Sequence, residues 1–374
     1  MALAPSPFSR HEILERLRLI RTETVGPISF RQLLRQYGTV DAALEALPNL
    51  ARRGGRKGPL RIPSRAEADR ELSALEALGG KMIAQDGPDY PGNLAAIPDA
   101  PPLLSLIGNQ HLLHQRVIAI VGARNASLAG CRIAFNLAQE LAQAGIIVIS
   151  GLARGVDTHA HKGSIEGGTI AVMAGGVDIP YPESNTDLYK EIAQRGALIS
   201  EIPLGIHPQA SHFPRRNRLI AGVALGVAVI EAAAKSGSLI TARLAADYGR
   251  EVFAVPGSPL DPRNRGCNDL LRQGATILES AEDILQSLAS QESSRILERK
   301  GRDFMEIPLD TPSEQVLEKA RIKVIEALGP TPTEVDTIIR HCLLSTPVVL
   351  TVLLELELAG RLERHFGGRV SLLN

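Results

Sequence analysis

The sequence of 374 residues predicts an α/β protein built around a mostly parallel, doubly wound sheet. Three observations support this fold class: short apolar runs recur between residues 117 and 255, helix-length segments separate them, and several runs end near Gly or Ser. Strands that are apolar throughout are buried on both faces, which is typical of parallel sheets covered by helices. Ligands of such sheets bind at the carboxyl ends of the strands.

A small helical domain is expected to precede the sheet, over residues 1–85. Leu and Ile recur at helical spacing in residues 11–20 and 28–37, and Val25-Gly26-Pro27 separates the two segments with a sharp turn. The basic, glycine-rich run at residues 52–58 is too polar for a core element and is expected to be a loop. A further helix is expected over residues 64–78, followed by a proline-rich connection.

The sheet domain is expected over residues 86–288. Its strands should be the apolar runs at residues 117–122, 146–151, 169–173, 197–200, 227–230 and 252–255. Residues 289–312 are charged and poorly periodic, which indicates a linker. Residues 313–374 then show three helical segments and a hairpin signal around Gly367-Gly368, the pattern of a winged helix. The third of these helices, residues 346–359, carries no Arg or Lys, so we do not expect it to read a major groove.

Charge is unevenly distributed although the whole chain is neutral, with 41 basic and 41 acidic residues. Residues 1–65 hold 12 Lys/Arg against 5 Asp/Glu, residues 66–310 hold 22 against 28, and the remainder holds 7 against 8. A basic module before an acidic one suggests a polyanionic partner. Aromatic residues make up only 3% of the chain, so phosphate contacts would have to supply most of the affinity for nucleic acid.

Cysteine usage and the N-terminus indicate a cytoplasmic protein. Cys131, Cys267 and Cys342 are far apart and odd in number, so they suggest neither a disulfide framework nor a zinc site. The first ten residues contain no apolar segment of the kind found in signal peptides, and no apolar run is long enough to span a bilayer. We therefore expect neither secretion nor membrane insertion.

The segment from His212 to Arg218 is the strongest candidate binding motif. It places Phe213 beside the guanidinium groups of Arg215, Arg216 and Arg218, with Asn217 between them. Arginine forks match phosphate oxygens and a phenyl ring can stack on a base, so the motif is suited to nucleic acid. A salt-bridged surface turn is the alternative.

Two loops that follow predicted strands offer further contacts for an anion. Gly122-Ala123-Arg124 follows the first long strand, and Ser127 can cap the next helix. Lys235, Ser236, Gly237 and Ser238 likewise stand before a helix, where small hydroxyls and amides form an anion site. The G-x-G-x-x-G pattern is absent, as is the acid that would hold a ribose, so no dinucleotide cofactor is expected.

The chain offers little support for metal binding or catalysis. Asp157, His159 and His161 are suitable ligand types, but at the start of a helix the two histidines would lie on different faces. We expect Asp157 to serve as a helix cap and no metal to be bound. No nucleophile–base arrangement or carboxylate pair is evident, so no catalytic residues and no cofactor are predicted and the protein is expected not to be an enzyme.

Taken together, these motifs resemble the DNA-processing protein A family, DprA, also called Smf. The matching segments run in family order from Val121 to Gly257 and include Gly122-Ala123-Arg124, Ser150 to Asp157, Tyr181-Pro182, Phe213 to Gly222, Glu231-Ala232 and Ser236 to Thr241. The flanks look like the family's helical N-terminal domain, of SAM or helix-hairpin-helix type, and its winged helix.

The resemblance implies a Rossmann-like domain that binds and protects single-stranded DNA, forms a homodimer and loads RecA recombinase onto the strand during natural transformation. By position, Gly122, Arg124 and the Phe213 to Arg218 turn would line the DNA pocket, with the Ser236 loop close by. Some relatives carry lysines where this chain has Glu183 and Ala210-Ser211, and Arg215, Lys162 or Lys235 could replace that charge.

The sequence leaves the dimer seam and two alternative functions open. Leu270, Leu271 and Ile277 are candidates for the dimer seam, although each could equally belong to the core. A nucleotide-processing hydrolase on the same kind of fold is the alternative function. A third possibility is an adaptor in which the arginines are structural.

Overall fold

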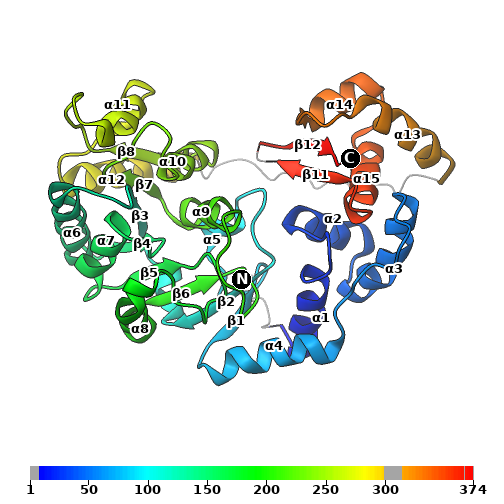
Figure 1. The fold of residues 1–374 in the computed structure, drawn as a ribbon, viewed down its shortest axis with the longest axis horizontal. Helices are drawn as coiled ribbons and strands as arrows, with labels where there is room; N and C mark the ends of the chain where they lie inside the picture. The colour runs from blue at the N-terminus through cyan, green and yellow to red at the C-terminus, as the bar shows by residue number, and fades with distance from the viewer. Residues whose placement is uncertain (1–7, 299–313, 366, 374) are drawn as a thin grey trace. The chain divides into compact units, whose positions relative to one another are not determined.

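The computed structural model describes residues 8–298, 314–365 and 367–373, and the chain divides into two compact units (Figure 1). Unit 1 comprises Met1–Phe8 and Arg70–Arg302 and contains the large sheet. Unit 2 comprises Ser9–Asp69 and Asp303–Asn374. Unit 2 therefore combines segments from both ends of the chain.

Unit 1 is built around a sheet whose nine described strands lie in the order β1-β2-β6-β5-β4-β3-β7-β8-β9. All six strands expected from the apolar runs are present, and every pairing among them is parallel. Their bounds are β3 (Val117–Val121), β4 (Ile147–Ser150), β5 (Thr169–Val172), β6 (Ala197–Ser200), β7 (Gly226–Val229) and β8 (Glu251–Ala254). The predicted mostly parallel α/β fold is confirmed.

Three short strands extend the sheet beyond the expected set. β1 (Lys81–Ala84) and β2 (Leu103–Gly108) pair antiparallel at one edge, and β9 (Thr276–Ile277) pairs with β8 at the other. β1 falls within residues 1–85, which the sequence suggested were helical. Its four residues begin with a lysine and are too few to show a strand period.

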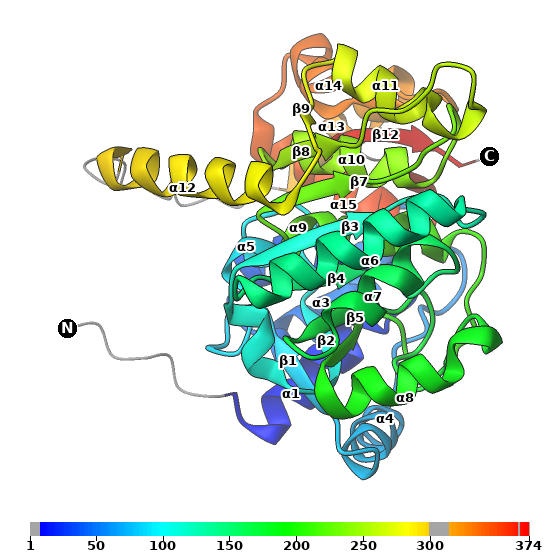
Figure 2. The same ribbon diagram turned by 90° about the vertical axis from the view of Figure 1, so that its left-hand side faces the viewer.

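Helices cover both faces of the sheet because successive residues of each strand point to opposite sides. Ile118 and Ile120 of β3 pack on the face with α6 (Leu128–Gln143), α7 (Val156–Ser164) and α12 (Ala281–Glu298). Ala119 and Val121 face α5 (Gly92–Ala95), α9 (His212–Val223) and α10 (Ser238–Asp247). Figure 2 shows α6 and α7 lying across the strands.

The strand order changes direction at β3. This strand pairs with β4 on one side and with β7 on the other, so the chain moves outward from β3 in both directions. The loops that follow β3, β4 and β7 therefore diverge at the carboxyl edge and leave a crevice between them. In open α/β sheets such a switch point is where ligands bind.

The remaining helices of unit 1 complete its edges. Leu75 of α4 (Arg65–Ala77) shares a core with α8 (Thr186–Arg195). α11 (Arg265–Arg272) precedes β9, and Leu270 and Leu271 pack partly buried against the larger core. α12 continues to Glu298, so the first part of the expected linker, residues 289–312, is helical, and residues 299–312 lie outside the described residues.

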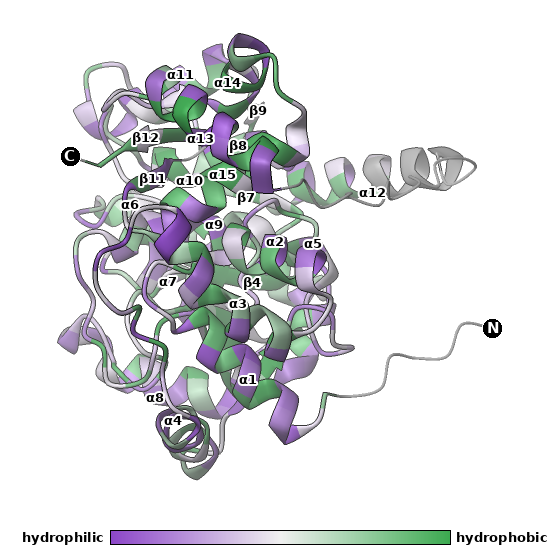
Figure 3. Ribbon diagram, turned by 90° about the vertical axis from the view of Figure 1, so that its right-hand side faces the viewer, coloured by the Kyte–Doolittle hydropathy of each residue, from purple (hydrophilic) through white to green (hydrophobic). Residues whose placement is uncertain are grey.

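Unit 2 contains the expected helical module and winged helix. α1 (Arg10–Ile20) and α2 (Pro27–Tyr37) match the predicted segments, whereas α3 (Val40–Arg53), which carries Pro48 in its interior, has no counterpart among the expected elements. Ser9 and Thr39 cap α1 and α3 by accepting a backbone hydrogen bond. Figure 3 shows hydrophilic and hydrophobic residues along α1 and α3, as expected for helices with one buried face.

The winged helix has the three helices and hairpin predicted for it. Its elements are α13 (Glu314–Ala327), β10 (Thr333–Glu334), α14 (Val335–Cys342), α15 (Thr346–Leu358), β11 (Leu362–His365) and β12 (Arg369–Leu372). The three described strands form an antiparallel sheet in the order β10-β12-β11.

The third helix of the winged helix, α15, is buried by the N-terminal module. Leu354 and Leu358 are inaccessible to solvent and share a core with Phe30 of α2 and Leu47 of α3. Other residues of α15, such as Val352, pack inside the winged helix itself. This double burial explains why α15 contains no Arg or Lys.

No individual helix in the described segments has both the length and the apolar character needed to cross a membrane. The consecutive helices α14 and α15 reach the required composition only when taken as a pair, and the pair is bent by 118°.

Candidate nucleic-acid interface

Two adjoining pockets lie at the carboxyl edge of the central strands, and we call them together the strand-end groove. The larger, about 560 Å³, is lined by the β3–α6 loop, α9, the β7–α10 loop and the segment after β8, including Gly122, Pro214, Lys235, Ser236, Gly237, Ser238 and Arg263. The smaller, about 280 Å³, is lined by the β4–α7 loop and the Tyr181 turn, including Gly151, Arg154, Tyr181, Glu183 and Ser184. Arg124, Ala153 and Phe213 line both pockets.

A cation and two aromatic rings stand where the two pockets meet. The guanidinium carbon of Arg124 lies 4.7 Å from the centroid of the Phe213 ring, a cation–π contact. The ring of Tyr181 packs on Phe213 at a centroid distance of 5.8 Å and an interplanar angle of 56°. Arg124 is exposed, and so is Tyr181, at 46%. These side chains offer apolar rings for a base and a guanidinium group for a phosphate.

Arg216 lines the larger pocket from a buried position. It is 6% exposed, and its Nη1 donates hydrogen bonds to the carbonyl oxygens of Gly151 and Val172, the latter at 2.9 Å. These carbonyls stand at the ends of β4 and β5. Burial lowers the pKa of Arg216 to about 10, so the group stays charged at neutral pH. The direct contact of Arg216 with a phosphate stays a prediction, because its Nη1 is engaged by the strand ends while its Nε has no hydrogen-bond partner among the described residues.

Arg218 is turned inward as well. It is 3% exposed, forms an ion pair with Glu201, which follows β6, and donates to the carbonyl oxygen of Asp99. The Asp99 carboxylate lies 3.6 Å from its Nε. Arg218 lines neither pocket and two acids of the loops around it neutralise its charge, which gives it a structural role, and its contact with DNA stays a prediction.

Asn217 joins α9 to the loop before α10. Its Nδ2 donates to the carbonyl oxygen of Gly237 at 3.2 Å, and the hydroxyls of Ser236 and Ser238 lie 2.7 Å apart in the same loop. Ser238 begins α10, and its backbone amide donates to the Ser236 hydroxyl oxygen at 3.4 Å. The predicted loop therefore does line the groove, held in place by Asn217.

Of the three cations considered as replacements for the lysines of some relatives, the structure places one at the groove. Lys235 is exposed and lines the larger pocket. Lys162 on α7 and Arg215 on α9 are exposed but line neither pocket. Neighbouring residues of a helix point in different directions, so Arg215 on α9 faces solvent although the next residue, Arg216, points into the protein.

Three groove residues were missed by the sequence analysis as binding candidates. Arg154 lies in the smaller pocket, beside the Glu183 turn, and Arg263 lies in the larger one, where it pairs with Asp261 at 2.7 Å. Tyr181 was noted only as part of a turn. The signal that could have found Arg154 is its place directly after a strand end, the same signal that identified Arg124.

The β4–α7 loop is held rigidly behind the groove. Leu152 adopts a left-handed conformation with φ of 54°, and Gly155 has φ of 77°. The Asp157 carboxylate accepts hydrogen bonds from the backbone amides of Gly151 and Ala153, at 3.2 and 3.3 Å. Burial raises the pKa of Asp157, and the nearby charge of Arg216 opposes that rise. Asp157 lies within α7, whose N-cap is Gly155, so the expected helix-cap role is not observed, and the side chain instead fixes the loop before the helix.

The D-x-H-x-H segment does not gather its side chains into a metal site. His159 Nδ1 lies 2.9 Å from the carbonyl oxygen of Gly155, and His161 Nδ1 lies 2.7 Å from the Thr169 hydroxyl. His161 is fully buried, and burial together with Arg216 lowers its pKa to about 3. His161 is therefore neutral at physiological pH.

A carboxylate occupies the position where a nucleotide fold would hold a phosphate. Glu231, which follows β7, accepts hydrogen bonds from the backbone amide and hydroxyl of Ser127, at 2.8 and 2.5 Å. Ser127 also accepts from the amide of Gly130 and so caps α6, as predicted. A Cβ at Gly130 would lie 2.6 Å from the Glu231 carboxyl carbon, so the helix start is filled by this acid.

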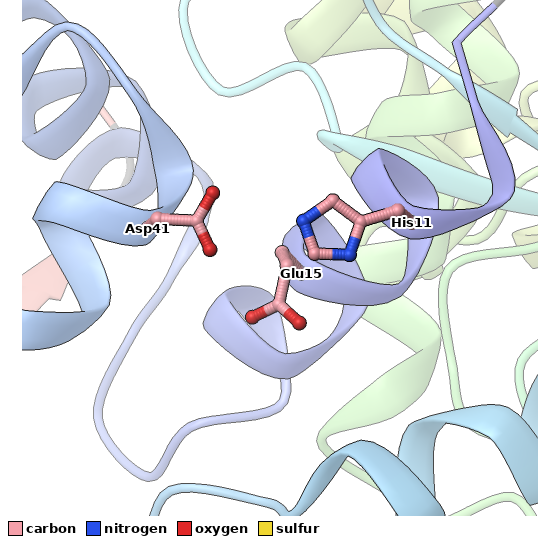
Figure 4. A group of neighbouring side chains, drawn as sticks. All are labelled: His11, Glu15 and Asp41. Carbon is pink, nitrogen blue, oxygen red and sulfur yellow. The ribbon is translucent and has the colours of Figure 1, made fainter.

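Within the described segments, one further group has metal-ligand chemistry, and it lies in unit 2. The ligand atoms of His11, Glu15 and Asp41 lie within 4.8 Å of one another (Figure 4). The Glu15 carboxylate is buried and already paired with Arg18 and, at 2.6 Å, with Arg65. Because two arginines supply the positive charge, we assign no metal to this group.

Comparison with known proteins explains the arrangement of domains. The sequence profile of the DNA recombination-mediator protein A family matches residues 81–289. The chain belongs to this family. The profile of the DprA-like N-terminal HHH domain matches residues 10–74, and that of the DprA winged helix domain matches residues 308–368. The resemblance drawn from the motifs is thereby confirmed.

Individual relatives support the assignment. Protein Smf of Escherichia coli (strain K12) is 38% identical over 311 residues, which span 82% of each chain. DNA processing protein DprA of Bacillus subtilis (strain 168) is 43% identical over 222 residues, 59% of this chain and 75% of the relative.

Solved structures of the family share the fold. The X-ray structure of DprA from Streptococcus pneumoniae has a TM-score of 0.64 at 33% identity and covers 75% of this chain and 98% of its own. A structure of DNA processing protein A from Helicobacter pylori, described as giving insights into a unique single-stranded DNA binding mode, has a TM-score of 0.52 at 29% identity, covering 57% and 96%.

Proposed function

We propose that this protein binds single-stranded DNA in the strand-end groove and acts as a recombination mediator that loads RecA recombinase onto the strand during natural transformation. The observation that carries the proposal is the cluster of Arg124, Phe213 and Tyr181 at the meeting point of the two pockets. An unpaired strand exposes base faces that stack on such rings, whereas a duplex hides them.

The charge of the groove supports a phosphate backbone as its ligand. Arg124, Arg154 and Lys235 are exposed on its walls, and Arg263 lines the larger pocket. The acids that line it are Glu183 and the buried Asp157. This local excess of positive charge reconciles DNA binding with a sheet domain that is acidic overall.

The remaining parts of the proposal follow from family membership. We propose a cytoplasmic homodimer that works by binding, without catalysis, with Leu270, Leu271 and Ile277 as seam residues. Ile277 is 56% exposed in the single chain, as a seam residue would be. The description of the family as a recombination mediator supports RecA as the partner.

The hydrolase alternative is less compatible with the site. A nucleoside phosphate in this kind of fold binds at the helix start after the first central strand. Here the Glu231 carboxylate fills that position and would repel a phosphate. The groove therefore suits a strand that passes along the carboxyl edge of the sheet better than a nucleotide held at the N-terminus of α6.

A mobility-shift titration of the full-length protein with single- and double-stranded oligonucleotides tests the proposal. We expect preferential binding of the single strand, with affinity that falls as salt rises. Equal binding of both forms would contradict the proposal that exposed bases stack on the aromatic rings of the groove. Incubation with nucleotides should give no base release, and clear turnover would favour the hydrolase.

A further inference from the structure

Unit 2 carries a second concentration of positive charge that the groove does not use. Residues 1–65 hold 12 Lys/Arg against 5 Asp/Glu, and the basic run at residues 52–58 lies at the end of α3. The structure places this run against Arg361, which directly precedes β11 of the winged helix. Arg361 Nη1 donates to the carbonyl oxygen of Gly54 at 3.2 Å, across 307 positions of sequence.

Glycines make this close approach possible. A Cβ at Gly54 would lie 1.9 Å from the carbonyl oxygen of Glu355 in α15. At Gly55, where φ is +98°, a Cβ would lie 2.8 Å from Arg361 Nη1. The tight turn after α3 also brings the backbone amide of Arg56 within 2.9 Å of the Ala51 carbonyl oxygen. The basic run is thus fixed on the winged helix rather than left as a free loop.

We call Arg52, Arg56, Lys57 and Arg361 the basic corner. The guanidinium of Arg52 bonds Asn49 and the Pro48 carbonyl, which are neutral, and that of Arg361 bonds a carbonyl. Lys57 is exposed and forms no salt bridge with any described residue. Arg56 pairs with Glu23 at 2.7 Å.

The neighbouring acids of the winged helix have other partners. Glu355 is held by Arg321 at 2.7 Å, and Glu357 by Arg364 at the same distance. Glu357 also accepts a hydrogen bond from the Ser29 hydroxyl at 3.0 Å. Arg52, Lys57 and Arg361 are exposed and pair with neither of these acids.

We infer that the basic corner is a second contact surface for the sugar–phosphate backbone of single-stranded DNA. Arginine forks match phosphate oxygens, and flexible lysines add point charge. The corner carries no aromatic side chain, so it would bind without regard to base sequence. The winged helix would thus contact nucleic acid next to its wing, whereas α15, its usual reading helix, is covered by α2 and α3. The inference takes its ligand from the proposed function but depends on different residues.

Four full-length proteins separate the two sites: the wild type, a groove variant (Arg124→Ala with Phe213→Ala), a corner variant (Arg52→Gln, Lys57→Gln and Arg361→Gln), and the two combined. Affinity for a long poly-dT strand is measured over a series of salt concentrations. A matched control neutralises three exposed cations outside the groove and the corner, Arg132→Gln, Arg243→Gln and Lys323→Gln. Because Arg361 bonds Gly54, a variant changed only at Arg52 and Lys57 separates charge from folding.

We expect the groove variant to keep residual binding that the combined variant loses. The corner variant should bind more weakly than the control, with a salt slope smaller by about 0.7 for each lost phosphate contact, roughly 2 for three contacts. Hydrogen exchange should show protection of residues 52–58 by the strand. A corner variant with the affinity and slope of the control overturns the inference, as does a groove variant that loses all binding. If the groove variant binds like the wild type while the corner variant does not, the proposed function of the groove fails and the corner stands.

Discussion

At the scale of single residues, the three arginines of α9 divide into different roles. Arg215 points to solvent, whereas Arg216 and Arg218 bond strand-end carbonyls and acids in the interior. Buried guanidinium groups of this kind hold loops in position, because each donates to segments distant in the sequence. The exposed cations that line the strand-end groove are Arg124, Arg154 and Lys235, which lie on loops.

Substituting Arg218 with Met should affect stability far more than DNA binding. The change leaves the Glu201 carboxylate without its buried partner, and breaking a buried ion pair typically costs about 3–5 kcal/mol. The free energy of unfolding, measured by urea denaturation, checks this. Arg215→Met on the same helix is the matched control and should be near neutral. If Arg218→Met keeps wild-type stability but loses DNA binding, the structural role assigned to Arg218 is wrong.

His161 should make the fold sensitive to acid. Its pKa is about 3 in the folded protein, against 6.5 as its ordinary value. Between these values the unfolded chain binds a proton that the folded chain does not, so stability falls as the pH falls. The loss is about 1.4 kcal/mol per pH unit, or roughly 2 kcal/mol between pH 6.5 and pH 5.

Urea denaturation at pH 7 and pH 5 measures this contribution. His161→Gln should lose it, although the variant also weakens the bond to Thr169 at both pH values. His114→Gln, a change at an exposed histidine, should keep the wild-type pH dependence. Undiminished acid sensitivity in His161→Gln would show that another group is responsible.

At the scale of elements, the sequence predicted the strands well and their connections less well. The six central strands were recognisable because they are apolar on both faces. β1 and β9 were too short, and α3 was obscured by Pro48. For the site, strand-end loops identified Gly122, Arg124 and the Ser236 loop. The orientation of Arg216 and Arg218 could not be predicted, because their acceptors are backbone carbonyls and acids that only the folded topology brings near.

The close approach between α9 and the β4–α7 loop depends on Gly151. A Cβ at this position would lie 1.8 Å from Arg216 Nη1. We expect Gly151→Ala to displace Arg216 and destabilise the fold by about 1–3 kcal/mol. The loop carries Ala153 and Arg154, so strand affinity should fall as well. Thermal unfolding and DNA titration measure the two effects, and a variant unchanged in both would contradict the close packing. Gly92→Ala, at an exposed position with open space outside the groove, is the control.

At the scale of the whole molecule, the two ends of the chain form one unit with a shared core. α15 contributes to the interior of the winged helix and to that of the N-terminal module. Truncation of either end should therefore expose apolar residues of the other. The sequence placed these modules at opposite ends, and no local pattern indicated that they pack together.

Leu354→Ala tests the shared core. Leu354 is fully buried in the cluster that contains Phe30 and Leu47, and such truncations typically cost about 2–5 kcal/mol. Hydrogen exchange should increase in both α3 and α13. Ile322→Ala, at a side chain that is 62% exposed, is the control and should change neither. Faster exchange confined to the winged helix would show that the two modules are independent.

The central claim is that Arg124 and Phe213 of the strand-end groove, and not the exposed Arg215 of α9, bind the unpaired strand. The most direct measurement compares the affinity of Phe213→Ala and Arg124→Ala with that of Arg215→Ala for single-stranded DNA over a range of salt. We expect Phe213→Ala to lose about 1–3 kcal/mol of binding free energy. Arg124→Ala should lower the salt slope by about 0.7, while Arg215→Ala stays close to the wild type. Wild-type affinity in both groove variants, with a loss only in Arg215→Ala, would contradict the account.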